Sequence, residues 1–231
     1  YTKAISIDRT YARGYMKRAL VYRFLQRFQE ANIDYQYALR INPYSEYIYN
    51  ERAKLKMMAM DYKGAMEDIS KAISLNPENT ESRELQVDDL IALGRYDQAL
   101  KVLDSIEYDQ DSLGFLEPLK RTYICILKKD WDQAELNLDS VFNADTVLAV
   151  AYDLKGMLLF GQERYDESLE AYTQAISVDP DFAIAYYNRS LNYRAQGNQK
   201  KALADLNKAI EISKNERNSF LARAGVKKAM G

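Results

Sequence analysis

Apolar residues recur at intervals of three and four along most of the chain. The segment LIALGRYDQALKVLDSI, residues 90–106, contains two such runs on either side of Gly94. Because one face of an α-helix repeats every 3.6 residues, this spacing predicts two amphipathic helices joined by a short turn. We therefore expect an all-α chain built from helical hairpins.

The hairpins repeat with a period of 34 residues. A small residue marks each unit, at successive spacings of 34, 34, 35, 34 and 34: Ala31, Ala65, Ala99, Ala134, Ser168 and Ala202. An aromatic residue stands three positions before each of the first five, and a small or aliphatic residue follows all six at seven positions. Small side chains at this spacing let the paired helix approach closely. The columns together predict a tandem array of two-helix units.

A shorter pattern returns in the first helix of the units. Residues 14–19, 48–53 and 185–190 read GYMKRA, IYNERA and AYYNRS, which is an aromatic residue, an arginine three positions later and then a small residue. We interpret this as a packing unit and not as a ligand-binding motif. The aromatic residue is expected in the core, with the arginine stem over apolar neighbours and the charged head in water.

With this period and these columns, the chain resembles the tetratricopeptide repeat family, whose 34-residue unit is a helix-turn-helix. The resemblance implies an all-α, right-handed α-solenoid superhelix over residues 1–231. Its expected segments are the end of a truncated repeat at 1–11, repeats at 12–45, 46–79, 80–113, 115–148, 149–182 and 183–216, and a final helix at 217–231. Since both ends fall inside a repeat, we expect a piece of a longer protein.

Composition argues against catalysis and against several classes of partner. The chain has no histidine and one cysteine, Cys125, and it contains no phosphate-binding glycine loop or zinc motif. Its net charge of −2 gives no overall attraction to nucleic acid. No apolar run approaches the roughly 18–20 residues of a membrane span. We expect a soluble, non-enzymatic protein without cofactor, metal, nucleic acid or membrane insertion, in the cytoplasm or a bacterial periplasm.

The remaining candidate chemistry is a surface for another protein. In the family, the first helices form the concave wall, and the second, fifth, sixth, ninth, twelfth and thirteenth positions of each face the groove. The candidate partner-binding residues are Arg13, Lys17, Tyr47, Asn50, Lys54, Glu84, Asp88, Leu119, Tyr123, Asp153, Tyr187, Asn188 and Arg194. This wall is basic, then acidic, then apolar, which suits an extended peptide or a partner helix.

Other interpretations stay open. The groove is alternatively filled by neighbouring repeats of a longer chain, within a sensory, regulatory or cell-envelope assembly protein, and a second copy of the chain is a further partner to consider. The clamp with which related repeat proteins grip the acidic carboxy terminus of heat-shock chaperones is incomplete. Asn188 matches its middle position, but Asp153 and Met157 stand where lysine and asparagine are required.

Overall fold

The computed structural model describes residues 1–107, 116–143, 148–214 and 217–230. These ranges are mostly α-helical and contain no strand, which confirms the expected all-α class. The repeat boundary expected at 113–115, the last positions of the sixth repeat at 215–216, and residue 231 lie outside the described residues.

The chain forms two compact units, Tyr1–Tyr108 and Asp109–Gly231. The helices of the first unit are α1 (Thr2–Ile7), α2 (Ala12–Phe24), α3 (Phe28–Ile41), α4 (Glu46–Met58), α5 (Tyr62–Leu75), α6 (Thr80–Ala92) and α7 (Tyr96–Asp104). Those of the second are α8 (Leu116–Lys128), α9 (Trp131–Phe142), α10 (Ala149–Gly161), α11 (Tyr165–Val178), α12 (Ala183–Ala195), α13 (Gln199–Ile212) and α14 (Arg217–Met230).

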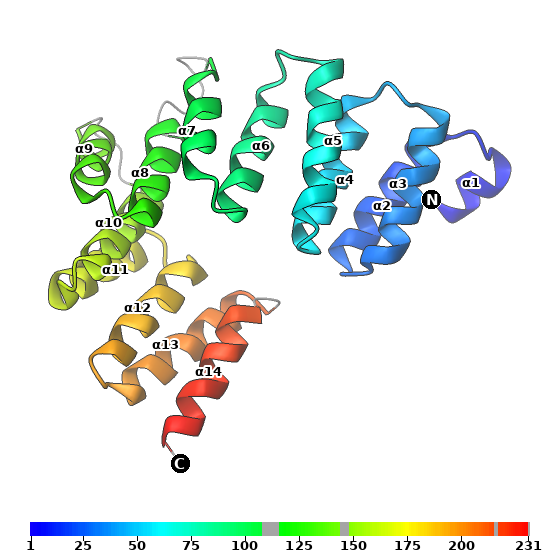
Figure 1. Cartoon of the computed structure of the whole chain (residues 1–231). Helices are drawn as coiled ribbons and strands as arrows, with labels where there is room; N and C mark the ends of the chain where they lie inside the picture. Colours follow the sequence, from blue (N-terminus) through cyan, green and yellow to red (C-terminus); the bar gives the residue numbers. More distant parts are fainter. Residues whose placement is uncertain (108–115, 144–147, 215–216, 231) are drawn as a thin grey trace. The chain divides into compact units, whose positions relative to one another are not determined.

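Consecutive helices pair as hairpins within each unit (Figure 1). The first unit contains the pairs α2–α3, α4–α5 and α6–α7, and the second contains α8–α9, α10–α11 and α12–α13. Each hairpin also contacts the next one in its unit, through pairs such as α5–α6 and α11–α12. Successive first helices also contact each other, as α4 and α6 do in the first unit and α10 and α12 in the second.

The small residues that mark the repeat lie where these helices meet. All six, Ala31, Ala65, Ala99, Ala134, Ser168 and Ala202, are fully buried. The column seven positions later is buried as well, from Ala38 to Ala209. Ser168 fits in place of alanine because its hydroxyl donates to the carbonyl of Gly156 in the paired helix, at 2.8 Å. The predicted close approach of the paired helices is thus confirmed.

One residue in each of these six hairpin turns adopts the left-handed backbone conformation. These residues are Gln26, Met60, Gly94, Lys129, Glu163 and Gly197, with φ between 58° and 76°. The next residue in each turn donates its N–H to a carbonyl five residues earlier, as Arg95 does to Leu90 at 2.8 Å. This bond closes the end of the first helix and directs the chain into the second.

Candidate functional site

The candidate partner-binding residues lie on the first helices of the hairpins, α2, α4 and α6 in the first unit and α8, α10 and α12 in the second. Their exposure depends on the position within the helix. Arg13, Tyr47 and Arg194 are exposed, and Tyr47 presents 41% of its surface. Positions five and six are mostly closed, because neighbouring first helices contact each other there.

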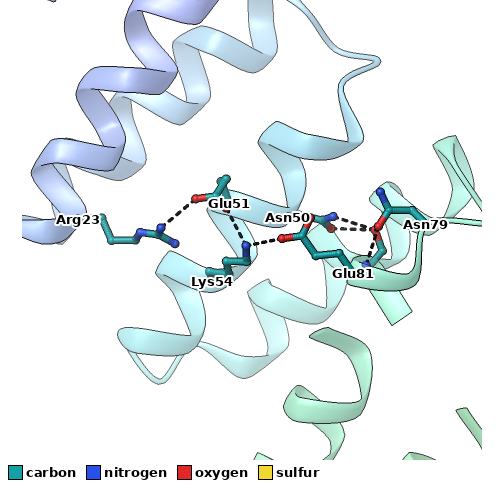
Figure 2. Close-up of polar contacts among 7 residues, drawn as sticks. Arg23, Asn50, Glu51, Lys54, Asn79 and Glu81 are labelled. Atoms are coloured by element: carbon teal, nitrogen blue, oxygen red, sulfur yellow. Dashed lines mark hydrogen bonds and ion pairs between the residues drawn. The ribbon is translucent and has the colours of Figure 1, made fainter. Parts of the chain in front are cut away.

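Asn50 is completely buried between α4 and α6. Its amide nitrogen donates to the hydroxyl of Ser82 at 2.9 Å, and that hydroxyl lies 3.0 Å from the amide oxygen. Figure 2 shows this contact, which continues to the cap residue Asn79. Leu119 is likewise 8% exposed, in the core of its unit. We therefore correct the expectation for Asn50 and Leu119: both hold helices together, and neither is open to a partner.

Asp153 is also closed off, with 4% of its surface exposed. The amide nitrogen of Asn188 in α12 donates to both of its carboxylate oxygens, at 3.0 and 3.1 Å. Burial raises the pKa of Asp153 to about 6, although the bonds from Asn188 oppose the rise. The two residues thus join α10 to α12. The middle position of the chaperone clamp, Asn188, is occupied by this internal bond.

The charges on the wall of the first unit largely neutralise one another (Figure 2). A guanidinium nitrogen of Arg23 lies 2.9 Å from Glu51, and Glu51 accepts a hydrogen bond from Lys54 at 2.8 Å. Lys54 also bonds Glu81 of α6. This chain of alternating charges crosses α2, α4 and α6. Charges from the predicted basic and acidic stretches thus pair across neighbouring helices at Arg23, Lys54 and Glu81. Lys54 bonds both Glu51 and Glu81.

The other candidates are half-buried. They are Lys17, Glu84, Asp88, Tyr123, Tyr187 and Asn188. Asp88 and Tyr123 interact with other parts of the protein, so their side chains are already engaged. The open part of the wall is consequently smaller than expected: its most exposed candidates are Arg13, Tyr47 and Arg194.

Sequence reasoning missed a set of arginine–aspartate pairs inside the hairpins. Each arginine of the aromatic-arginine pattern donates two hydrogen bonds to an aspartate 16 residues later: Arg18 to Asp34, Arg52 to Asp68 and Arg189 to Asp205. The three aspartates are nearly buried, at 2%, 3% and 7% exposure. The expectation that the charged heads stay in water is therefore wrong. The signal was present, since each aspartate stands three positions after the small residue of its unit.

The same arginines contact the aromatic residue three positions before them. The guanidinium carbon lies 5.7 Å from the ring centroid of Tyr15, Tyr49 and Tyr186 in the three hairpins. A cation over a ring face at this distance is attracted by the ring quadrupole. The aromatic-arginine pattern is thus a packing unit, as expected, and the guanidinium of the arginine is part of that packing.

The one cysteine of the chain, Cys125, lies in the core of the second unit. Cys125 is 5% exposed in α8, and burial raises the pKa of its thiol, which fits the small core residue expected there. Among the described helices, none combines the length and the apolar character that a bilayer crossing requires.

Comparison with known proteins decides the family. Two models described as tetratricopeptide repeat match residues 12–45 and 154–216. The chain contains tetratricopeptide repeats. The first match falls on the α2–α3 hairpin, and the second runs from α10 through the α12–α13 hairpin.

Similar proteins carry the same repeat. The human mitochondrial import receptor subunit TOM70 is 27% identical over 217 residues, covering 89% of this chain and 35% of that protein. The solved structure of the APC/C hetero-tetramer Cut9–Hcn1 has a TM-score of 0.68, with 15% identity and coverage of 97% of this chain and 44% of that one. The solved structure of yeast Tom70 has a TM-score of 0.67 and 18% sequence identity, and the match covers 99% of this chain and 48% of that one. This tetratricopeptide repeat chain therefore spans about a third of the TOM70 relative.

These findings define the general class of function. Tetratricopeptide repeats and the relatives that share them support a protein-interaction scaffold, and folds of this kind are generally non-catalytic.

Proposed function

We propose that the first-helix face of each unit captures an extended segment of a partner polypeptide. The observation that carries this proposal is an exposed apolar side chain at the second position of three first helices, two of which are neighbours in the second unit. Tyr47 in α4 is 41% exposed, Val150 in α10 is 37% exposed and Ile184 in α12 is 48% exposed. Large apolar side chains held at one position of a repeating wall are suited to anchor a ligand.

The spacing of the wall defines the segment that it accepts. Packed helices lie about 8–10 Å apart, so anchors on neighbouring first helices are separated by a similar distance. A segment in the extended polyproline II conformation advances about 3.1 Å per residue and presents every third side chain on one face, which brings every third residue of the ligand opposite a new helix. A segment with apolar residues at positions i and i+3 fits the anchors of α10 and α12.

The polar contacts between first helices support the same function. The bonds Asn50–Ser82 and Lys54–Glu81 tie α4 to α6, and the pair Asp153–Asn188 ties α10 to α12. They hold the anchors in register before a ligand arrives. A surface that is already ordered loses less conformational entropy on binding, which favours affinity.

The relationship to TOM70 is consistent with a polypeptide ligand, since that relative is described as a mitochondrial import receptor subunit. We propose for this chain only the recognition of a polypeptide segment.

The test is selection of binding peptides from a displayed random library, followed by affinity measurements on purified variants. Peptides are selected on the whole chain and assigned to the unit that they contact. Tyr47→Ala should lower the affinity of peptides bound to the first unit, and Ile184→Ala that of peptides bound to the second, each by about tenfold, the loss expected for a buried anchor. Leu136→Ala is the matched control, because Leu136 is 60% exposed but lies on α9, a second helix. Selected peptides that lose affinity with Leu136→Ala and keep it with the other two would overturn the proposal.

A further inference from the structure

The hairpin α10–α11 lacks the arginine–aspartate pair that its neighbour α12–α13 contains. At the position of Arg189 stands Lys155, and at the position of Asp205 stands Ala171, again 16 residues later. Lys155 has no ion pair with any described residue, and its ammonium lies 5.7 Å from the ring centroid of Phe142 in α9. The ammonium thus lies near a ring of the preceding helix, and its charge also acts on Glu167 of α11.

An open cleft occupies the space beside these two residues. Its volume is about 410 Å³, and it is formed by α9, α10 and α11 of the second unit. Buried leucines such as Leu138 and Leu158 line it, together with Ala171. The corresponding groove of the first unit, beside Arg52, measures about 250 Å³. The shorter side chains at 155 and 171 thus accompany a larger opening.

One ring in the cleft lacks the cation that its counterparts have. Tyr152 corresponds to Tyr15, Tyr49 and Tyr186, each of which has a guanidinium 5.7 Å from its centroid. No described cation lies over Tyr152, whose ring instead contacts Phe142 at 5.1 Å. The ring of Tyr152 therefore lacks the guanidinium contact that the corresponding tyrosine has in three other repeats.

The rim of the cleft carries more negative than positive charge. It has four carboxylates, Glu135, Asp139, Glu167 and Glu170, against two cations, Lys155 and Arg164. Arg164 is engaged by Glu167 at 2.5 Å and lies 4.0 Å from Glu135. Asp139 and Glu170 form no ion pair with a described residue and are exposed. The remaining charges are the two carboxylates and the single ammonium of Lys155, so the cleft favours a cationic ligand group over an anionic one.

We propose that this cleft is a second binding site, which accepts an arginine side chain of a partner polypeptide. The alkyl stem of that arginine packs on the leucines and Ala171, and its guanidinium lies over Tyr152 within reach of Asp139 and Glu170. The partner's arginine would make the ring contact that an arginine of the chain itself makes in the hairpins α2–α3, α4–α5 and α12–α13. The site is separate from the first-helix wall, since α9 and α11 are second helices and α10 contributes its opposite face.

The direct test is nuclear magnetic resonance titration of the ¹⁵N-labelled chain with blocked tripeptides Gly-Arg-Gly, Gly-Lys-Gly and Gly-Glu-Gly. The arginine peptide should shift amide signals of α9, α10 and α11, and it should bind at least about fivefold more tightly than the lysine peptide, which stacks less well on a ring. The glutamate peptide should shift none of these signals. Preference for glutamate, equal response to all three, or shifts confined to other helices would overturn the proposal.

A variant with the arginine–aspartate pair restored tests whether binding depends on the cleft itself or only on the charge around it. The double variant Lys155→Arg/Ala171→Asp restores the pair seen in α12–α13, so it fills the cleft while keeping the net charge of the rim within one unit. It should fold as the wild type does, judged by circular dichroism, and lose at least about tenfold in affinity for the arginine peptide. Unchanged affinity in this variant would contradict the proposal. The conservative variant Asp139→Asn/Glu170→Gln should weaken binding about fivefold, with a smaller dependence on salt than the wild type.

Discussion

Replacing Asp89 with asparagine is expected to stabilise the protein at neutral pH. Asp89 lies in α6 with 0% of its surface exposed, and neither carboxylate oxygen accepts a hydrogen bond from a described residue. Burial raises the pKa of Asp89 from 3.8 to about 6, with a further rise from Asp61 and a partial offset from Arg95. A charged group in this environment destabilises the folded state.

The size of the effect follows from that pKa. Each pKa unit corresponds to about 1.4 kcal/mol, so ionised Asp89, raised from 3.8 to about 6, costs roughly 3 kcal/mol. The folded state binds the proton more tightly than the unfolded state. The free energy of unfolding therefore falls as pH rises from about 4 through about 6, and it stays at the lower level above.

Another repeat shows what an amide does at this position. Asn192 is the counterpart of Asp89, is also 0% exposed, and donates from its amide nitrogen to the carbonyl of Tyr165 at 3.0 Å. The corresponding carbonyl for position 89 is that of Tyr62, 27 residues earlier in both cases. We expect the new amide to make this bond, for a gain of about 1–3 kcal/mol at pH 7.

Urea unfolding followed by far-ultraviolet circular dichroism, at about pH 4 and about pH 7, measures this gain. Asp89→Asn should gain more at the higher pH, because only there is the wild-type carboxyl ionised. The reciprocal variant Asn192→Asp is the control, and it should lose stability more strongly at pH 7 than at pH 4. If Asp89→Asn is no more stable than the wild type at pH 7, or gains equally at both pH values, the buried carboxylate is not the destabilising group.

Three further changes probe the repeat itself, each by thermal or urea unfolding. Ala65→Leu should lose about 1–3 kcal/mol, because Ala65 is fully buried between paired helices, and a neutral result would contradict the repeat frame. Glu163→Gly should gain about 1 kcal/mol, because Glu163 has φ of 63° in the turn before α11; a loss would show that its side chain contributes more than the backbone costs. Arg189→Ala should lower the free energy of unfolding by about 2–3 kcal/mol, because it leaves the buried Asp205 unpaired. A change below about 0.5 kcal/mol would mean that the pair does not stabilise the fold.

The repeat was predictable because it depends on side-chain size along one helix at a time. Ala31 and Ala134 are small since the paired helix leaves no further room, and the same restriction returns in every unit. The arginine–aspartate pairs carried an equally regular signal. Asp34, Asp68 and Asp205 occupy one position of their repeats, but an aspartate at that position does not by itself show that it pairs with an arginine 16 residues earlier.

The candidate wall was predicted less well, for a definite physical reason. The position of a residue within a helix determines the direction in which its side chain points. It does not determine how near the neighbouring first helix lies. Lys17 and Asn188 occupy the sixth position and remain partly open, whereas Asn50 and Asp153 at the fifth are closed by bonds to the neighbouring helix. Burial of these polar groups depends on partners 32 to 35 residues away.

The amino-acid sequence by itself determined the helical hairpin, its 34-residue period and the family, because these follow from hydrophobic spacing and side-chain size within one repeat. Only the tertiary structure decided which polar residues face water, how the charges of Arg23, Glu51, Lys54 and Glu81 pair across three helices, and where a cleft remains beside Lys155 and Ala171. These features arise from the distances between packed helices, and those distances are set by all their contacts together.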